Sequence, residues 1–344
     1  MHTDRPLFGA FTDPAADRWG QTLLRRHEPR PLLAIDFLTL VDDETCLGAL
    51  RFTEGAGGAF LSATGKRVPP LLELPRLLAA TTRIVDDEET DDDLKLLLAP
   101  GTSLGGARPK ASVRDKDGHL LVAKFPHKED EWPVTRWEAA TLSLSRSAGV
   151  TVPKGRLAIV LRKPVVLTRR FDRKAAARVP FMSAMTALDA IDNESRSYLE
   201  IVDFLRREGA DVGRDLRQLW QRVVFNILVS NTDDHLRNHG FLRDAKGWRL
   251  APAYDLNPIP VDVKPRVHAL AIDEMEGASS LDPALSVARA FGVAKRGEAR
   301  AIAANVGGAV ARWRDAAASA GIKAREMDRM ASAFEHDDLA EAIA

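Results

Sequence analysis

The sequence predicts an α+β fold of two lobes, a mixed α/β amino-terminal lobe over residues 1–168 and a mainly helical carboxyl-terminal lobe over residues 169–344. Three observations predict it. Short apolar runs bounded by turn residues, which are typical of strands, recur through the first half. From residue 182 onward the apolar spacing is mainly helical. The length of 344 residues is enough for one large domain or two ordinary ones.

The composition is that of a globular protein. Apolar residues make up 45% and charged residues 28%, which excludes a disordered, collagen-like or disulfide-rich chain. Because 49 basic residues balance 49 acidic ones, no net charge draws the chain to nucleic acid or an anionic membrane. The single cysteine, Cys46, cannot form an internal disulfide and is expected to be a core or edge thiol. Since neither a membrane span nor a secretory signal is visible, we expect a cytoplasmic protein.

The first 100 residues are predicted to contain two strands and two helices. Residues 33–40 and 47–52 indicate strands joined by a turn, and residues 71–85 have helical spacing. Seven acids fill residues 86–93 with one interruption. We interpret this block as a solvated turn whose last acids lie at the start of the next helix, where carboxylates are favoured. A metal or partner site is the alternative.

A glycine-rich loop and a hairpin are predicted over residues 101–126, with the turn at Asp117 and Gly118. A helix follows over residues 132–148 and ends at Gly149, and two strands follow over residues 157–161 and 164–167. Nine Lys or Arg residues face one acid between residues 154 and 178. Solvated strand edges would explain this excess, and a patch that faces phosphate or a partner is the alternative.

The carboxyl-terminal lobe is predicted to centre on a buried helix over residues 216–229. Residues 240–242 and 248–250 predict a second hairpin. Alanine-rich helices should then occupy residues 283–334, with breaks at Gly292 and Gly321.

The densest polar group follows the buried helix, at residues 231–238. Such groups beside an apolar helix must be exposed in a cleft or satisfy one another. Asp233 and Asn238 are five residues apart. A kinase catalytic loop has the same spacing between the aspartate that accepts the hydroxyl proton and the asparagine that holds magnesium. A capped, hydrogen-bonded loop is the alternative.

Asp255 lies seventeen residues beyond Asn238, after the second hairpin. A strand pair likewise separates the catalytic loop of a kinase from its magnesium aspartate. Asn238 and Asp255 offer the hard oxygen ligands that magnesium prefers. No Phe-Gly pair follows Asp255, and an ordinary turn is the alternative.

Two upstream residues complete the functional order of a kinase. Lys124, on a strand after the glycine loop, could neutralise nucleotide phosphates, or it could be a strand-end lysine that reaches water. Glu138, fourteen residues on, could pair with Lys124 or be a solvated helix residue. Two competing motifs are absent. Lys-Ser/Thr does not follow Gly106, as a Walker loop requires, and no glutamate follows His235, as the zinc-protease motif requires.

Taken together, these motifs resemble the HipA family of bacterial toxin kinases from about residue 5 to the carboxyl terminus. The segments that carry the resemblance are residues 19–20, 103–110, 124–126, 170–173, 231–238 and 253–256. The resemblance implies a two-lobed, protein-kinase-like (HipA-like) fold and an atypical Ser/Thr kinase that uses ATP and Mg²⁺.

The resemblance also assigns roles. Asp233 would be the catalytic base, His235 would support it in the catalytic loop, and Asn238 and Asp255 would hold magnesium. Lys124 would contact the nucleotide phosphates, with Glu138 as the supporting ion pair.

The nucleotide would lie against two further segments. Ser103, Gly105, Gly106 and Ala107 would form the phosphate loop, and Ser103 matches the serine that the family autophosphorylates. A dianionic group there would repel the ATP phosphates and expel the loop. The segment Leu167–Phe171 would be the hinge beside adenine, with Arg169 and Phe171 as its binding residues, although Arg169 stands where an acidic residue is expected.

The family further implies partners. A helix-turn-helix antitoxin would bind the kinase and DNA, and DNA would be contacted only through it. Some shorter members obtain an additional amino-terminal domain from a separate small protein, as this chain would. The protein substrate would be an aminoacyl-tRNA synthetase, whose phosphorylation stalls translation. The alternatives are a kinase of the same fold that acts on a small molecule or lipid, and a pseudokinase that serves as a co-repressor.

Overall fold

A computed structural model of the chain describes residues 6–63, 68–101, 106–175, 177–273 and 278–344. The chain divides into two compact units. The first contains Met1–Glu131 and Lys154–Met182, and the second contains Trp132–Pro153 and Ser183–Ala344. The functional lobes predicted for residues 1–168 and 169–344 stay a prediction. The two compact units differ from them in that each unit is made of two separate stretches of the chain.

The first unit is built on a four-stranded antiparallel sheet of order β1-β2-β4-β3. Its hairpin turn lies at Asp117 and Gly118 as predicted, and Gly118 takes a φ of 83° that suits glycine. The strands are β1 (Lys110–Arg114), β2 (Leu120–Lys124), β3 (Gly155–Val160) and β4 (Lys163–Arg169).

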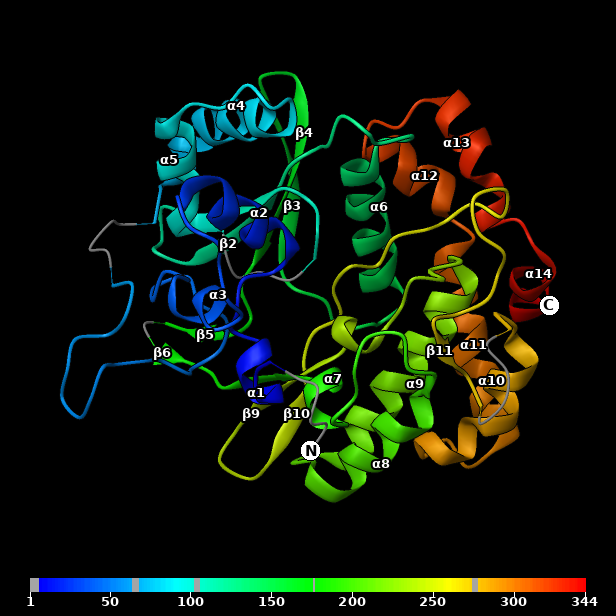
Figure 1. Cartoon of the computed structure of the whole chain (residues 1–344). Coiled ribbons are helices and arrows are strands. Elements are labelled where there is room, and N and C mark those ends of the chain that lie inside the picture. Colours follow the sequence, from blue (N-terminus) through cyan, green and yellow to red (C-terminus); the bar gives the residue numbers. More distant parts are fainter. Residues whose placement is uncertain (1–5, 64–67, 102–105, 176, 274–277) are drawn as a thin grey trace. The chain divides into compact units, whose positions relative to one another are not determined.

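Three helices pack with this sheet, as Figure 1 shows for α2 (Arg18–His27), α4 (Leu74–Val85) and α5 (Asp91–Gly101). Their apolar stripes and the sheet form one core, in which Leu23, Leu77 and Leu97 are fully buried. The shorter elements of this part are α1 (Gly9–Thr12), α3 (Asp36–Thr39), η1 (Leu71–Glu73), β5 (Arg173–Lys174), β6 (Ala177–Arg178) and β7 (Phe181–Ser183), where the chain enters the second unit.

The acidic block lies where it was expected, before and within the first turn of α5. Arg26 pairs with Asp87 and Glu89 at 2.6 and 2.8 Å. The hydrogen bond from Arg83 holds the pKa of Asp93 well below its usual range. Ion pairs with arginines and the favourable position at the start of α5 therefore stabilise several carboxylates of this acidic block.

The two strands predicted for residues 33–40 and 47–52 are wrong. The first segment contains the short helix α3, and the second has no strand pairing. The Asp36 carboxylate accepts hydrogen bonds from the Leu33 N–H at 2.7 Å and from Arg30 at 2.7 and 2.8 Å. These bonds close a turn at the start of α3, so local capping prevails over the apolar alternation.

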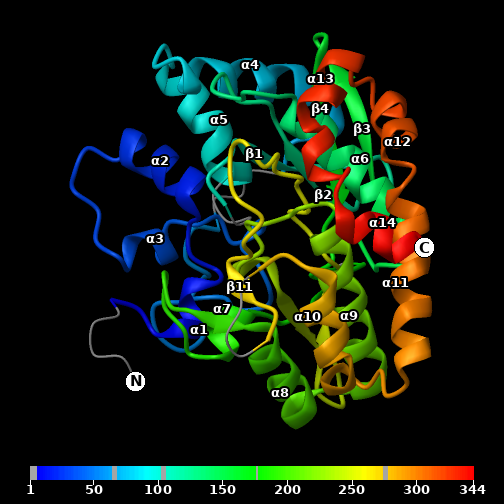
Figure 2. The same ribbon diagram turned by 90° about the vertical axis from the view of Figure 1, so that its right-hand side faces the viewer.

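The second unit is mainly helical and centres on α9 (Val212–Leu228), which contacts α8, α10, α11 and α14 (Figure 2). The breaks predicted at Gly292 and Gly321 are confirmed, because both adopt the left-handed φ that ends helices. The other elements are α6 (Val134–Ser147), α7 (Ala184–Ala187), β8 (Arg196–Ser197), α8 (Tyr198–Glu208), η2 (Leu236–Asn238), β9 (Gly240–Arg243), β10 (Trp248–Leu250), β11 (Leu270–Ala271), α10 (Leu281–Val287), η3 (Ala288–Phe291), α11 (Arg296–Val310), α12 (Trp313–Ser319), α13 (Ala324–Met330), η4 (Ala331–Ala333) and α14 (Asp337–Ile343).

Helix α6 belongs to this second unit although the chain on both sides of it belongs to the first. An aromatic stack holds it there: the Trp137 ring lies 6.1 Å from Trp313 and 5.8 Å from Phe334, centroid to centroid. Arg136 also donates to the Ala320 carbonyl at 2.5 Å.

Among the helices that the structure describes, none is both long and apolar enough to cross a membrane.

A buried carboxylate ties the end of β4 to residues 45–48 in the first unit. Asp172 accepts from Arg170 at 2.9 and 2.6 Å, from Arg173 at 2.5 Å and from the Gly48 N–H at 2.8 Å. Arg170 and Arg173 also donate to backbone carbonyls of that segment. Burial raises the pKa of Asp172, but the two guanidiniums outweigh burial and keep it below the usual value.

We expect Asp172→Asn to lower the free energy of unfolding by about 3–5 kcal/mol, because two guanidiniums would remain buried without their counter-ion. Urea unfolding followed by circular dichroism measures this loss. The control is Asp117→Asn at the exposed hairpin turn, which should change stability by less than about 0.5 kcal/mol. Equal stability of the two variants would contradict the structural role of Asp172.

Candidate active site

The predicted catalytic loop begins where α9 ends, and the backbone turns sharply there. Ser230 takes a φ of 49°, and the Asn231 N–H donates to the Asn226 carbonyl at 2.9 Å. The loop passes through η2 into β9, and β9 forms the predicted hairpin with β10. A helix end and a strand therefore fix the two ends of the loop.

The two adjacent aspartates of this loop have opposite environments. The side chain of Asp233 is 68% exposed, whereas that of Asp234 is 2% exposed. The nearest cation to Asp233 that the structure shows is Lys264, at 3.8 Å, too long for a strong hydrogen bond. Asp233 is thus available to a substrate, and Asp234 belongs to the core.

Asp234 is the acceptor at the centre of a buried polar network. Its Oδ2 accepts from the Tyr198 hydroxyl at 2.5 Å and from the Asn226 amide at 2.8 Å, and it lies 2.8 Å from the Nε2 of His239. Burial raises the pKa of Asp234, but the attraction of His239 and these hydrogen bonds outweigh burial and lower it to about 2. The carboxylate is therefore ionised while buried, and it joins α8, α9 and the end of the loop.

The structure brings the two predicted magnesium ligands into neighbouring segments. The Asn238 amide donates to the Asp233 carbonyl at 3.2 Å, and that bond uses the nitrogen of the amide and not its oxygen. The Tyr254 hydroxyl donates to the Arg237 carbonyl at 2.7 Å, so the residue before Asp255 is bonded to the residue before Asn238. Asp255 itself has a φ of 55°, a conformation that costs energy for a residue other than glycine.

A second bond anchors the Asp255 segment. The Leu256 carbonyl accepts from the Thr141 hydroxyl of α6 at 2.5 Å, and Leu256 is buried. Two buried polar atoms nearby, Nδ1 of His235 and Oδ1 of Asn257, have no hydrogen-bond partner among the residues that the structure describes. Buried polar atoms without partners are often completed by water, an ion or a ligand.

In the first unit, the predicted phosphate loop is anchored at both of its described ends. Ser103 and Gly105 lie outside the described residues, and Ala107 is exposed. The Gly106 carbonyl accepts from the Lys110 ammonium at 2.9 Å, which also pairs with Asp17 at 3.1 Å. At the other end, a Cβ on Gly101 would lie 2.9 Å from a Leu23 methyl, so helix packing leaves no space for a side chain there.

The remaining predicted residues occupy both units. Lys124 is the last residue of β2 and lies opposite Val166. Arg169 ends β4, and the Phe171 ring lies 6.0 Å from that of Phe181. Glu138 is buried in α6 of the second unit, and its pairing with Lys124 stays a prediction.

The sequence analysis missed the residues that hold these loops. Asn226 interrupts the buried apolar stripe of α9, and Lys110 is a buried lysine at the start of the largely buried strand β1. Both are polar residues at positions that the apolar pattern assigns to the core, and this is the signal that could have revealed them. Their partners Tyr198 and Asp17 are distant in the sequence and carry no such signal.

Comparisons with known proteins give the family and the fold of the chain. The family model described as HipA-like C-terminal domain matches residues 102–335. The Sinorhizobium fredii protein named "Putative kinase Y4mE" is 26% identical over 180 residues, which cover 45% of this chain and 41% of that protein. A Haemophilus influenzae protein named "Putative kinase" is 26% identical over 186 residues, covering 46% of this chain and 54% of that one. The matches thus span about half the length of these curated relatives.

The fold is shared with a solved structure. HipA of the Shewanella oneidensis toxin–antitoxin system, solved with HipB and its operator DNA, aligns with a TM-score of 0.68 and 15% identity. The alignment covers 97% of this chain and 83% of that chain. The predicted α+β, two-lobed, kinase-like fold of the HipA type is therefore confirmed.

We expect Asp234→Ala to lower the free energy of unfolding by about 3–5 kcal/mol, because three buried polar groups would lose their acceptor. The matched control is its neighbour: Asp233→Ala removes an exposed carboxylate and should cost less than about 0.5 kcal/mol. Tryptophan fluorescence during urea unfolding is a suitable probe, since five of the six tryptophans lie in the second unit. A similar loss in both variants would refute the division of roles.

A buried histidine next to this network makes stability depend on pH. Burial lowers the pKa of His268 to about 4, and its Nε2 lies 2.9 Å from the Ser279 hydroxyl oxygen. The unfolded chain binds this proton near pH 6.5, whereas the folded chain does so only near pH 4. The stability that neutral His268 contributes is therefore complete above pH 6.5 and is lost as the pH falls towards 4, by about 3 kcal/mol.

His268→Asn should flatten the decline of unfolding free energy between pH 6.5 and pH 4, measured by urea unfolding at several pH values. His27→Asn, at an exposed position of α2, is the control and should leave the decline unchanged. An unaltered slope in the His268 variant would show that another group causes the acid sensitivity.

Proposed function

The chain belongs to the HipA-like C-terminal domain family, and from this premise we propose that it is an ATP- and Mg²⁺-dependent serine/threonine protein kinase. The observation that carries the proposal is the exposed Asp233 on a loop whose neighbour, Asp234, is locked in the core. A rigid loop with one accessible carboxylate suits a general base, which must stay within hydrogen-bond reach of the proton that it accepts. The curated relatives, which are named as kinases, add support.

In the proposed reaction, Asp233 orients the substrate hydroxyl and accepts its proton as the γ-phosphoryl group of ATP is transferred. His235 and Asn238 support the loop around it. Asn238 and Asp255 provide an amide and a carboxylate oxygen, a donor set that fits magnesium. The ion would supply charge neutralisation at the phosphates when it is bound.

The nucleotide would be held by residues of the first unit. Lys124 would contact the phosphates, with Glu138 as its partner, and the loop of Ser103, Gly105, Gly106 and Ala107 would cradle them. The bond from Lys110 to the Gly106 carbonyl supports a defined carboxyl-terminal end for that cradle. Arg169 and Phe171 would lie beside adenine.

We further propose that the kinase is the toxin of a bacterial toxin–antitoxin system. The solved relative is HipA in complex with HipB and operator DNA, which supports a helix-turn-helix antitoxin as partner here. The balanced charge of this chain suits DNA contact through that partner alone. The proposed substrate is an aminoacyl-tRNA synthetase, the proposed self-inactivation is autophosphorylation at Ser103, and a separate small protein would supply the additional amino-terminal domain.

The test is phosphoryl transfer by the purified chain, after removal of any phosphate already present. We expect ATP and Mg²⁺ to add phosphate at Ser103, detected by intact mass and phosphopeptide mapping. Asp233→Asn should slow this transfer by about 10²–10⁴-fold, because proton transfer to a positioned base contributes that much. Asp255→Asn should weaken Mg²⁺-dependent nucleotide binding.

The control is Asp203→Asn on α8, which removes an exposed carboxylate of the second unit and should keep the full rate. Full activity of Asp233→Asn would remove Asp233 as the base. No transfer together with no Mg-ATP binding would favour the pseudokinase co-repressor. Transfer to a metabolite or lipid, with no protein phosphorylated, would favour the small-molecule kinase.

A further inference from the structure

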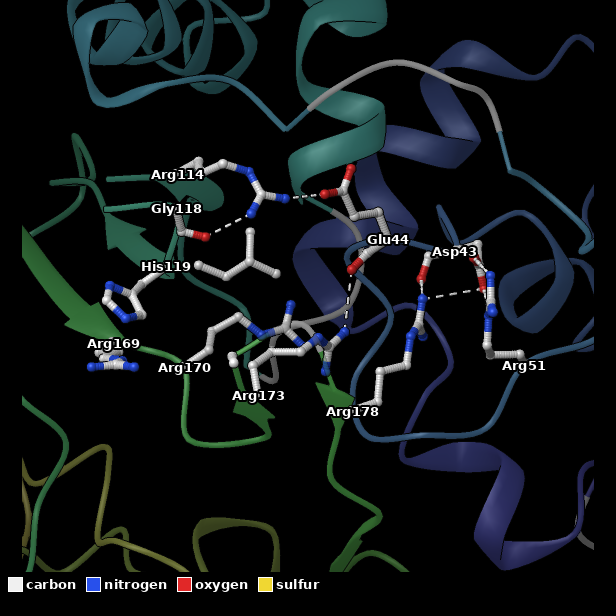
Figure 3. A pocket seen from close by; sticks show the side chains of 12 residues that line it. Asp43, Glu44, Arg51, Arg114, Gly118, His119, Arg169, Arg170, Arg173 and Arg178 are labelled. Atoms are coloured by element: carbon white, nitrogen blue, oxygen red, sulfur yellow. Dashed lines mark hydrogen bonds and ion pairs between the residues drawn. The ribbon is translucent and has the colours of Figure 1, made fainter. Parts of the chain in front are cut away.

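A pocket of about 380 Å³ lies wholly within the first unit (Figure 3). It opens at the end of the sheet where the β1–β2 hairpin turns and β4 ends. Its other walls are formed by Asp43, Glu44 and Arg51 and, at β5 and β6, by Arg173, Ala175 and Arg178. Its volume is within the range of sites that bind small molecules.

Among the described residues of the lining, positive charge exceeds negative charge. Two carboxylates, Asp43 and Glu44, line the pocket, and Asp172 lies directly behind it in contact with Arg170 and Arg173. Three carboxylates therefore face six guanidiniums, which leaves an excess of three positive charges before His119 is considered. The arginines are Arg51, Arg114, Arg169, Arg170, Arg173 and Arg178.

Most of these arginines have structural partners. Arg170 and Arg173 donate to Asp172 and to backbone carbonyls. Arg51 pairs with Asp43 and stacks on the Phe60 ring, and Arg114 pairs with Glu44. These groups form the rigid frame of the pocket.

Two arginines keep donors to spare. Arg169 forms no hydrogen bond or ion pair through its side chain with any residue that the structure describes. Arg178 uses Nη2 on Asp43, but its Nη1 is buried and has no partner in the described part of the chain. A buried cationic donor without an acceptor is costly, and a bound anion would satisfy it.

The pocket is separate from the position where the nucleotide phosphates are expected. Along the β1–β2 hairpin, Lys124 lies opposite Lys110, whereas the pocket begins where Leu120 lies opposite Arg114. Four residues of strand, about 13 Å, separate these two pairs. Arg169 is shared with the segment proposed to lie beside adenine, but adenine, which is flat and uncharged, gives no reason for the other five guanidiniums.

From this pocket we infer a second ligand site, which binds the phosphate group of a small phosphorylated organic molecule. Guanidinium forks match the paired oxygens of a phosphate, and a dianion balances most of the charge excess. The volume exceeds what a phosphate group alone needs, so an organic part fits beside it. The basic run noted between residues 154 and 178 thereby gains a function for its Arg169 and Arg178.

The test is isothermal titration calorimetry of the full chain with pyrophosphate, without Mg²⁺ and at constant ionic strength. We expect saturable binding that Arg169→Gln and Arg178→Gln each weaken about tenfold or more, as the loss of a charged hydrogen bond predicts. Arg156→Gln on β3 removes the same charge from an exposed position outside the pocket and should stay within twofold. Lys124→Ala should also stay within twofold.

Loss of binding in Lys124→Ala would assign the pyrophosphate to the nucleotide site and overturn the inference. Equal weakening of pyrophosphate binding in Arg156→Gln would show that the overall positive charge, and not this pocket, attracts the anion. Absence of saturable binding would exclude the site. If Arg178→Gln does not fold, Arg178→Lys decides, because it keeps the positive charge beside Asp43 and removes the guanidinium fork. Arg169→Gln does not decide by itself, because the proposed function places Arg169 beside adenine. Phosphoryl transfer is not measured here, so failure of the proposed kinase activity would leave this test unaffected.

Discussion

The buried charge of Asp234 is the constraint on which the candidate active site depends. A carboxylate that stays ionised in the core must collect donors, and here Tyr198, Asn226 and His239 supply them from α8, from α9 and from the residue just before β9. Those same contacts fix the loop between α9 and β9. Because Asp233 directly precedes Asp234 on that fixed loop, it is presented to solvent. The accessibility of one aspartate thus follows from the burial of the other.

The first unit uses the same device. Asp172 is buried between Arg170 and Arg173, and together they bind the backbone of residues 45–48 to the end of β4. This ion cluster lies behind the arginine-rich pocket and holds Arg170 and Arg173, two of the guanidiniums that line it. In both units a buried, fully bonded carboxylate holds an irregular segment beside a proposed ligand site.

Sequence patterns predicted the elements with a strong repeat: the β1–β2 hairpin from its Asp-Gly turn, and α9 from its long apolar stripe. They failed at residues 33–40, where the carboxylate of Asp36 closes a helical turn that apolar alternation does not reveal. The candidate site was predicted by residue type and order, but the different environments of Asp233 and Asp234 were not. That difference arises from partners such as Tyr198, 36 residues away along the chain. Local patterns in one sequence do not reveal contacts between residues so far apart along the chain.

The position of α6 has a consequence for biosynthesis. This helix is made early, yet the rings that bury Trp137 belong to Trp313 and Phe334, about 180 and 200 residues later. At bacterial translation rates of roughly 5–20 residues per second, the apolar face of α6 stays unburied for roughly 10–40 s, until the residues that cover it have been synthesised. During that interval the nascent chain has an unburied tryptophan, and for roughly the first 2–9 s of it the first unit also lacks residues 154–182. Chaperone engagement during synthesis is therefore expected to concentrate on α6.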